Sequence, residues 1–273
     1  RGGREFVELS RDLSSMTSGL RERYEMQSAM KVAMEVQQNL LPQAAPDIAG
    51  LDIAATSIYS DETGGDYFDF LDREPENTDH KPDHVIAIGD VTGHGIGAAL
   101  IMASARAALR TRIRESEALG QLLQDVNETL VEDIPMGRFM TMLLMRVEPD
   151  ASGFRWASAG HDPPFVYDPN TDAFHEPDGG GVPLGVVEDE TYEQHLEPLH
   201  GPGSIVVTAT DGVWETVSPE GEFYGKDRLR TLVREHRERS AKEILDIVIL
   251  ETNRFRGHER AADDVTIVVF KIA

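Results

Sequence analysis

The order of the expected secondary-structure elements is the feature that most restricts the fold of this chain. Hydrophobic strands come first, then a pair of helices, then more strands, then a second helix pair and a last strand. We expect strands at 51–58, 66–72, 84–91, 139–148, 154–160, 164–168, 204–212 and 264–272, and helices at 98–117, 119–132, 227–236 and 241–255. Runs of strands separated from pairs of helices favour a layered α+β fold over alternating β-α-β units. A polar turn is expected at 73–83 and a surface loop at 175–185.

A long helix is expected before this block. Residues 5–41 contain no proline, and apolar residues recur there in steps of three and four, at Phe6, Leu9, Leu13, Met16, Leu20, Met30, Met34 and Leu41. Arg23, Gln27 and Gln37 interrupt the pattern. This imperfect heptad repeat predicts a helix that pairs with a second copy as a coiled coil and makes the protein a homodimer. The alternative is an amphipathic helix that lies on its own domain.

Two prolines, Pro42 and Pro46, stop that helix and mark a domain boundary. We therefore expect a linker helix over residues 1–45 and a separate domain over residues 46–273. The chain begins at Arg1 without a methionine, and we interpret it as part of a longer protein.

The composition excludes several classes of function. The chain has no cysteine, which rules out disulfides, thiolate zinc sites and cysteine nucleophiles and favours a cytoplasmic location. A formal net charge of -23 repels nucleic-acid phosphates and anionic membranes, so we expect neither as a partner. The sequence holds no apolar run of about 18 residues, so we expect no membrane insertion.

Acidic residues recur at the ends of the hydrophobic strands. Asp90 follows VIAIG, Asp211 follows IVVTAT, Asp263 and Asp264 precede VTIVVF, and Asp66 follows a glycine pair. Charged side chains are not expected to be buried there without a partner. Aspartates are common in turns, but if these meet they form an oxygen-rich site that suits Mg²⁺ or Mn²⁺.

Three glycines follow the central aspartate in the stretch IGDVTGHGIGAAL (88–100). Gly93, Gly95 and Gly97 allow a tight turn that could present a backbone carbonyl to a metal and leave room for a substrate. The competing interpretation is a dinucleotide-binding turn. The spacing here is G-x-G-x-G, the expected acidic residue after a following strand is missing, and no GxxxxGK[ST] loop is present, so nucleotide binding is the weaker hypothesis.

Six motifs in this order resemble the PPM (PP2C-like) family of metal-dependent serine/threonine phosphatases, and most closely its bacterial SpoIIE/RsbU branch. They are ETGGDYFDF (62–70), IGDVTGHGIGAAL (88–100), SAGHDPP (158–164), PLG (183–185), TATDGVWE (208–215) and DDVTIVVF (263–270). VQQNLLP (36–42) is also similar to that branch, and the resemblance covers about residues 35–273. It implies a two-layer β-sandwich flanked by antiparallel helix pairs, with an N-terminal linker helix.

The resemblance also implies a site that holds two ions, Mn²⁺ or Mg²⁺. Asp90 matches the aspartate that bridges both ions, and Val91 matches the residue that lends its carbonyl. Asp211 and Asp263 match further metal ligands, and these two with Asp90 are the expected catalytic residues. Asp66 matches an acid that binds a metal directly or through water. Asp264 occupies the place of a neighbouring polar residue and is a weaker candidate.

The same resemblance implies a substrate and a mode of regulation. The expected partner is a phosphorylated protein, an anti-sigma-factor antagonist, and the N-terminal helix is expected to connect a sensor domain and to regulate the site. Movement of the helix after Asp90 could switch metal binding. His94 and His161 lie in motifs typical of the branch, with either loop hydrogen bonding or proton transfer as their role. The arginine that binds phosphate in eukaryotic relatives has no counterpart in residues 60–65. The alternative function is a catalytically silent signalling module of the same fold.

Overall fold

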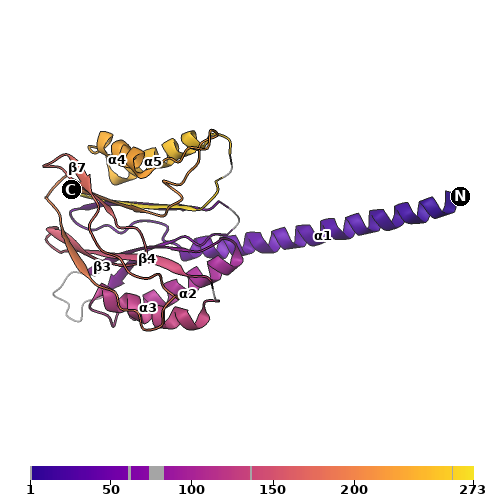
Figure 1. Cartoon of the computed structure of the whole chain (residues 1–273), viewed down its shortest axis with the longest axis horizontal. Coiled ribbons are helices and arrows are strands. Elements are labelled where there is room, and N and C mark those ends of the chain that lie inside the picture. The colour runs from indigo at the N-terminus through magenta and orange to yellow at the C-terminus, as the bar shows by residue number, and fades with distance from the viewer. Residues whose placement is uncertain (1, 61–62, 74–82, 136, 260) are drawn as a thin grey trace.

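The structure is a computed structural model that describes residues 2–60, 63–73, 83–135, 137–259 and 261–273. Two five-stranded sheets lie face to face between two pairs of helices, and one long helix projects to the side (Figure 1). The expected α+β fold, a two-layer β-sandwich with flanking helix pairs, is confirmed.

The first sheet has the strand order β1-β10-β9-β6-β7 and is antiparallel throughout. Its strands are β1 (Leu51–Ile58), β6 (Phe165–Asp168), β7 (Ala173–His175), β9 (Ile205–Ala209) and β10 (Val265–Ile272). Helices α4 (Lys226–Glu235) and α5 (Ala241–Arg256) cover its outer face. Ser240 begins α5 with a capping box, because its hydroxyl accepts from the Glu243 amide while the Glu243 carboxylate accepts from the Ser240 amide.

The second sheet has the strand order β2-β3-β4-β5-β8 and is also antiparallel. Its strands are β2 (Tyr67–Arg73), β3 (Asp83–Val91), β4 (Met140–Val147), β5 (Gly153–Ala159) and β8 (His195–Pro198). Helices α2 (Ile96–Arg112) and α3 (Leu119–Asp133) pack on its outer face. The main core lies between this sheet and its helices, and it extends to Val268 and Phe270 of the opposite sheet.

Three details of the expected fold are corrected. β7 and β8 were not expected, because they are short and alternate between half-buried and exposed residues. α2 ends at Arg112 rather than at residue 117, because the Glu115 and Ser116 amides both turn back to the Arg112 carbonyl. β9 ends at Ala209 rather than at residue 212, which leaves Asp211 in a turn. Most of the polar turn expected at 73–83 lies outside the described residues.

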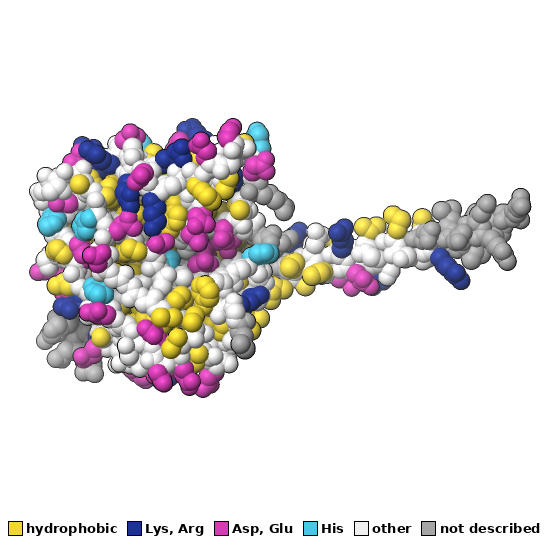
Figure 2. Space-filling model, in the orientation of Figure 1, with side chains coloured by type: hydrophobic (Ala, Val, Ile, Leu, Met, Phe, Trp, Pro, Cys, Tyr) yellow, Lys and Arg dark blue, Asp and Glu magenta, His cyan; other side chains and the backbone are white. Residues whose placement is uncertain are grey.

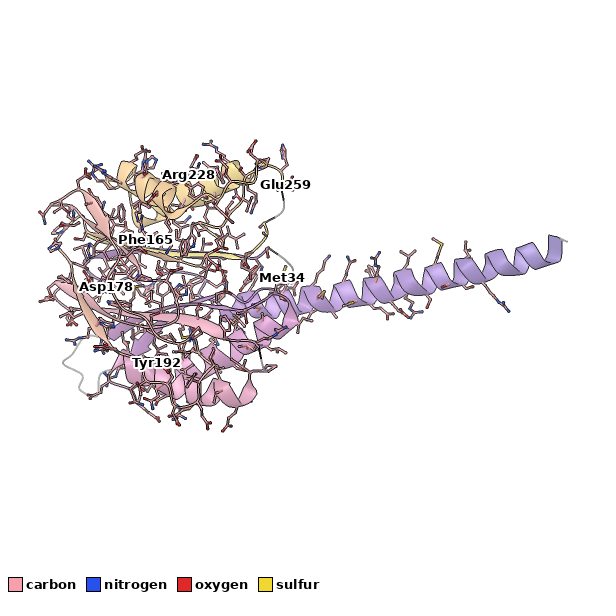
Figure 3. The ribbon with its side chains drawn as sticks, viewed as in Figure 1. Met34, Phe165, Asp178, Tyr192, Arg228 and Glu259 are labelled. Carbon is pink, nitrogen blue, oxygen red and sulfur yellow. The ribbon has the colours of Figure 1, made fainter. Side chains whose placement is uncertain are left out.

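Helix α1 (Gly2–Leu40) extends away from the domain over most of its length (Figure 1). The apolar side chains of Leu13, Met16 and Leu20 are 62–67% exposed, whereas Gln37 and Leu41 are buried. Figure 3 labels Met34 where the helix meets the domain. The alternative of an amphipathic helix lying on its own domain is therefore wrong for residues 13–29, which are exposed, whereas the last turns of the helix do contact the domain. The side chains of Phe6 and Leu9 lie outside the described part. Among the described residues, none of the helices contains an apolar stretch of the length that a membrane span requires.

Candidate metal centre

The two sheets bring four aspartates to one end of the sandwich. Asp66 directly precedes β2 and Asp90 is the penultimate residue of β3, and these strands are antiparallel neighbours, so the start of one meets the end of the other. Asp211 follows β9 and Asp263 precedes β10, which are neighbours in the opposite sheet. The Thr210 hydroxyl joins the two pairs, because it donates to Asp66 Oδ2 at 2.8 Å across the sheets. Figure 2 shows acidic side chains gathered on this face, on the side toward α1.

The aspartates perturb one another's ionisation. Burial, followed by the Asp90 charge, raises the pKa of Asp66 well above its ordinary value. Burial, followed by the charges of Asp211 and Asp263, raises the pKa of Asp90 to about 7. Burial and the Asp263 charge also raise the pKa of Asp211. Each effect reflects negative charge held close to other negative charge in a partly dry site.

A divalent cation would relieve this repulsion, and the donor set is entirely oxygen, as Mg²⁺ and Mn²⁺ prefer. No three His, Asp or Glu side chains of the described residues already form a ready-made ligand set. The residues therefore fit the expected ions by their chemistry and charge, whereas exact ligand geometry is not preformed in this part of the chain.

Asp264 holds the loop before β2 in place. It is buried, and its carboxylate accepts from the Ser60 amide at 2.8 Å, the Ser60 hydroxyl at 3.0 Å and the Gly65 amide at 3.0 Å. A side chain on Gly64 would begin 1.8 Å from Asp264 Oδ2, so only glycine fits there. Asp264 thus positions the loop that carries Asp66.

The Val91 carbonyl faces the same loop. A Cβ on Gly65 would lie 2.4 Å from the Val91 oxygen and 3.1 Å from Asp90 Oδ1, and the Val91 amide donates to the Gly65 carbonyl at 3.3 Å. The glycine pair therefore brings backbone close to both candidate ligands.

The glycine-rich turn after Asp90 has two different functions. Gly93 and Gly95 have φ angles of 85° and 83°, which glycine adopts without strain, and the Gly95 amide donates to the Thr63 carbonyl at 3.1 Å. Gly97 lies inside α2 and has no positive φ, so its expected part in the turn is wrong. It instead makes room for Arg138, whose Nη1 would lie 2.6 Å from a Cβ at this position.

His161 is a buried neighbour of the site. Its Nδ1 lies 3.0 Å from the Thr141 hydroxyl, and that hydroxyl lies 3.5 Å from the Asp90 carbonyl oxygen. Burial lowers the pKa of His161 to about 4, so the ring is neutral at pH 7, which favours hydrogen bonding over proton transfer. His94 is exposed in the glycine-rich turn.

Gln37 was not among the expected site residues. Its side-chain amide donates to the Gly64 carbonyl at 2.7 Å, and its side-chain oxygen accepts from the Gly64 amide at 3.3 Å. α1 is thereby bonded directly to the loop that carries Asp66. The sequence feature that could have indicated this contact is Gln37 itself, one of the polar residues that interrupt the apolar repeat of the helix.

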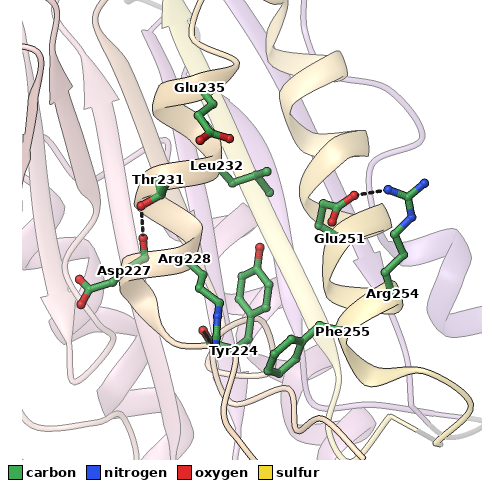
Figure 4. Close-up of a pocket in the computed structure, with 9 residues that line it drawn as sticks. All are labelled: Tyr224, Asp227, Arg228, Thr231, Leu232, Glu235, Glu251, Arg254 and Phe255. Carbon is green, nitrogen blue, oxygen red and sulfur yellow. Dashed lines mark hydrogen bonds and ion pairs between the residues drawn. The ribbon is translucent and has the colours of Figure 1, made fainter.

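A separate hollow lies between α4 and α5 (Figure 4). Its floor contains Tyr224 and Phe255, and Arg228 stacks over the Phe255 ring at 4.8 Å from the centroid. Arg254 pairs with Glu251. These cations are already engaged by neighbouring side chains, and none of the four aspartates lines this hollow.

Known proteins are similar to this chain in sequence and in fold. Residues 82–273 match the family model of stage II sporulation protein E, SpoIIE. The phosphoserine phosphatase RsbU of Bacillus subtilis is 32% identical over 254 residues, which cover 90% of this chain and 71% of RsbU. The SiaA-PP2C domain of Pseudomonas aeruginosa superposes with a TM-score of 0.77 at 20% identity, over 92% of this chain and 98% of that domain.

Two further structures are informative. The RsbU and RsbW domains of Rv1364c from Mycobacterium tuberculosis match with a TM-score of 0.66 at 25% identity, over 85% of this chain and 62% of that one. RsbX, solved in complex with magnesium, matches with a TM-score of 0.59 at 14% identity, over 84% of this chain and 99% of RsbX.

The paired antiparallel sheets, the flanking helix pairs and the similarity to RsbU define a protein phosphatase of the PP2C (PPM) class. Phosphatases of this class depend on metal ions, in agreement with the oxygen-only donor set. The chain belongs to the SpoIIE family, in its RsbU-like branch.

Proposed function

We propose that this chain hydrolyses phosphoserine or phosphothreonine on a protein with the help of two Mg²⁺ or Mn²⁺ ions. The side chains of Asp66, Asp90, Asp211 and Asp263 and the Val91 carbonyl would hold the ions. The observation that carries the proposal is the convergence of four carboxyl groups from both sheets, three of them with a raised pKa.

Ions bound there would supply an acidified water and neutralise charge on the phosphoryl group. The chain's own residues keep the ligands in place. Asp264 fixes the loop before β2 through three hydrogen bonds, and Thr210 orients Asp66. His161 supports Thr141 beside the Asp90 backbone. Asp90, Asp211 and Asp263 are the proposed catalytic residues because they would contact the ions directly.

The proposed substrate is a phosphorylated anti-sigma-factor antagonist in a bacterial partner-switching pathway, acting in the cytoplasm. The support is the similarity to the phosphoserine phosphatase RsbU and to a chain that combines RsbU and RsbW domains. The chain's own acidic surface is consistent with a protein rather than a nucleic acid as the partner.

Residues 1–45 form the proposed regulatory linker, and residues 46–273 the phosphatase domain. The exposed apolar side chains of α1, such as Leu13, Met16 and Leu20, would pair with a second copy in a coiled coil. The two hydrogen bonds between Gln37 and Gly64 would transmit a change in the helix to the loop before Asp66.

Phosphate release from a phosphorylated antagonist, measured while Mg²⁺ or Mn²⁺ is titrated in, tests the function. Wild type should require the cation, and Asp90→Asn or Asp211→Asn should be folded and inactive. Normal turnover by either variant would refute the site. Inactivity of wild type with every antagonist, together with the absence of cation binding, would instead support a catalytically silent signalling module.

The regulatory contact has a matched test. Gln37→Ala removes both bonds to Gly64, whereas Gln38→Ala alters an exposed neighbour. Loss of buried hydrogen bonds should raise the cation concentration for half-maximal activity by roughly fivefold or more in the first variant only. Equal behaviour of both variants would contradict the proposed regulation.

A further inference from the structure

Arg138 lies at the edge of the turn that follows Asp90. The β3–β4 ladder pairs Val91 with Met140, and it continues past the strand ends because the Thr92 amide donates to the Phe139 carbonyl at 3.0 Å and the Phe139 amide donates to the Thr92 hydroxyl at 3.0 Å. The next residue back along the chain is Arg138. Its backbone therefore lies two residues beyond the partner of Val91 and three beyond the partner of Asp90 in this ladder.

The Arg138 guanidinium packs against the first turn of α2. A Cβ on Gly97 would lie 2.6 Å from Nη1, 3.2 Å from Cζ and 3.3 Å from Nη2, so this glycine provides the space that the guanidinium occupies. The group also lies near the amino end of α2, where the helix dipole favours negative charge. The guanidinium and the amino end of α2 thus both favour an anion at this position.

The Nη1 atom of Arg138 is buried and has no hydrogen-bond partner among the described residues. No ion pair of Arg138 with an acidic side chain is present there either. Buried polar groups are normally hydrogen-bonded, so an unpartnered guanidinium nitrogen indicates a missing ligand. Such a ligand must accept hydrogen bonds, and a negative charge on it would be favoured beside the guanidinium.

Other cations of the described domain already have partners. Lys226 lies 3.1 Å from Asp162 and 3.5 Å from Glu176, and Arg110 pairs with Asp69 at 2.7 Å. Arg138 differs from both because its charge is not neutralised by a side chain of the described residues. A cation without an anionic partner beside a cluster of carboxylates would attract an approaching phosphate monoester.

We propose that Arg138 binds the phosphoryl oxygens of the phosphoserine or phosphothreonine substrate. The proposal rests on the phosphatase function proposed above and adds a substrate-binding residue to it. The planar guanidinium offers two parallel N–H groups to two oxygens of one phosphate, which gives orientation as well as charge. Arg138 would thereby bind the substrate phosphate, a role for which residues 60–65 contain no arginine.

Inorganic phosphate is the probe for this contact. Its affinity for wild type, Arg138→Met and Arg138→Lys is measured by calorimetry at fixed Mn²⁺, and its inhibition constant is measured against phosphoprotein turnover. Arg112→Met is the control, because it removes an exposed arginine from the far end of α2, the helix whose first turn contacts Arg138. We expect Arg138→Met to weaken phosphate binding by about 10- to 100-fold, the range for a charge-assisted hydrogen bond, and Arg112→Met to change it less than twofold.

Two further readouts separate substrate binding from a structural role. Mn²⁺ affinity should stay within twofold of wild type in Arg138→Met, and millimolar guanidinium should restore part of the activity of Arg138→Ala. Arg138→Lys keeps the charge without the fork and should show an intermediate loss.

Unchanged phosphate affinity in Arg138→Met, while wild type shows cation-dependent turnover, would overturn the role of Arg138 alone. If Arg138→Met does not fold, Arg138→Lys decides, because wild-type phosphate affinity in that variant would overturn the forked contact. Absence of cation-dependent turnover in wild type would instead overturn the phosphatase function itself.

Discussion

The buried ion pair between β2 and α2 gives a quantitative prediction. Asp69 is fully buried, and its two carboxylate oxygens accept from Arg110 at 2.7 and 2.8 Å. The Tyr67 hydroxyl donates to Asp69 at 2.9 Å, and Arg106 lies 3.8 Å away. Changing Arg110 to methionine removes the bidentate partner of Asp69. The buried carboxylate then keeps the Tyr67 hydroxyl and the more distant Arg106 to stabilise its charge.

Breaking a buried pair by removing one partner costs about 3–5 kcal/mol. The cost should be smaller here, about 2 kcal/mol, because the Arg110 side chain is 45% exposed and Arg106 remains nearby. For a domain of this size that loss corresponds to a fall in melting temperature of roughly 4–8 °C. Amide exchange in α2 should also become faster, because the pair ties the helix to β2.

Arg112 provides the control on the same helix. Its partner Glu115 lies 3.8 Å away, and both side chains are exposed, so Arg112→Met should cost less than about 0.5 kcal/mol. Urea unfolding followed by circular dichroism compares the two variants. If Arg110→Met is no less stable than Arg112→Met, the buried pair does not hold α2 to the sheet and the reasoning fails.

Three other perturbations follow from the site. Burial and neighbouring carboxylates raise the pKa of Asp90 to about 7, so with a chelator present its ionisation destabilises the fold as pH rises from about 4 to 7. Asp90→Asn should therefore exceed wild type in unfolding free energy by on the order of 2–4 kcal/mol at pH 8 and match it near pH 3. Equal unfolding free energies of the two proteins at pH 8 would contradict the assignment. Gly64→Ala would place a Cβ 1.8 Å from Asp264 Oδ2 and should lower both the melting temperature and the cation affinity, whereas Gly180→Ala, with nothing within 4 Å, should change neither. The pKa of His161 is lowered to about 4 by burial, so its ring signal in NMR should not titrate between pH 5 and 8, and stability should fall only as pH drops from about 6.5 toward 4; a midpoint near 6.5 would show that the ring is solvated.

The long elements were predictable because their sequences contain strong local signals. β3 and β10 contain the apolar runs VIAI and IVVF, and α5 has a capping box and a regular apolar face. β7 and β8 have three and four residues with alternating exposure, which is too short a pattern for a periodicity argument. Their position depends on the neighbouring strands β6 and β5 rather than on their own residues.

The aspartates of the proposed site could be singled out from the sequence because each lies at one end of a buried strand. The residues that support them were not, since their roles arise only when distant segments meet. Thr210 reaches Asp66 across 144 positions of the chain, and Gln37 reaches Gly64 across 27. The part played by Arg138 also depends on a contact with Gly97 that no local pattern encodes.

The division of the four aspartates between the sheets links ion binding to the integrity of the sandwich. Asp66 and Asp90 lie at the end of one sheet, and Asp211 and Asp263 flank strands of the other, so an ion that contacted both pairs would act as a removable crosslink between the layers. A slide of one layer over the other would separate the ligands before either sheet unravels. A cation at 100 times its dissociation constant would then add about 2.7 kcal/mol against that motion. Any signal that slides the layers past each other would therefore lower the affinity for the metal.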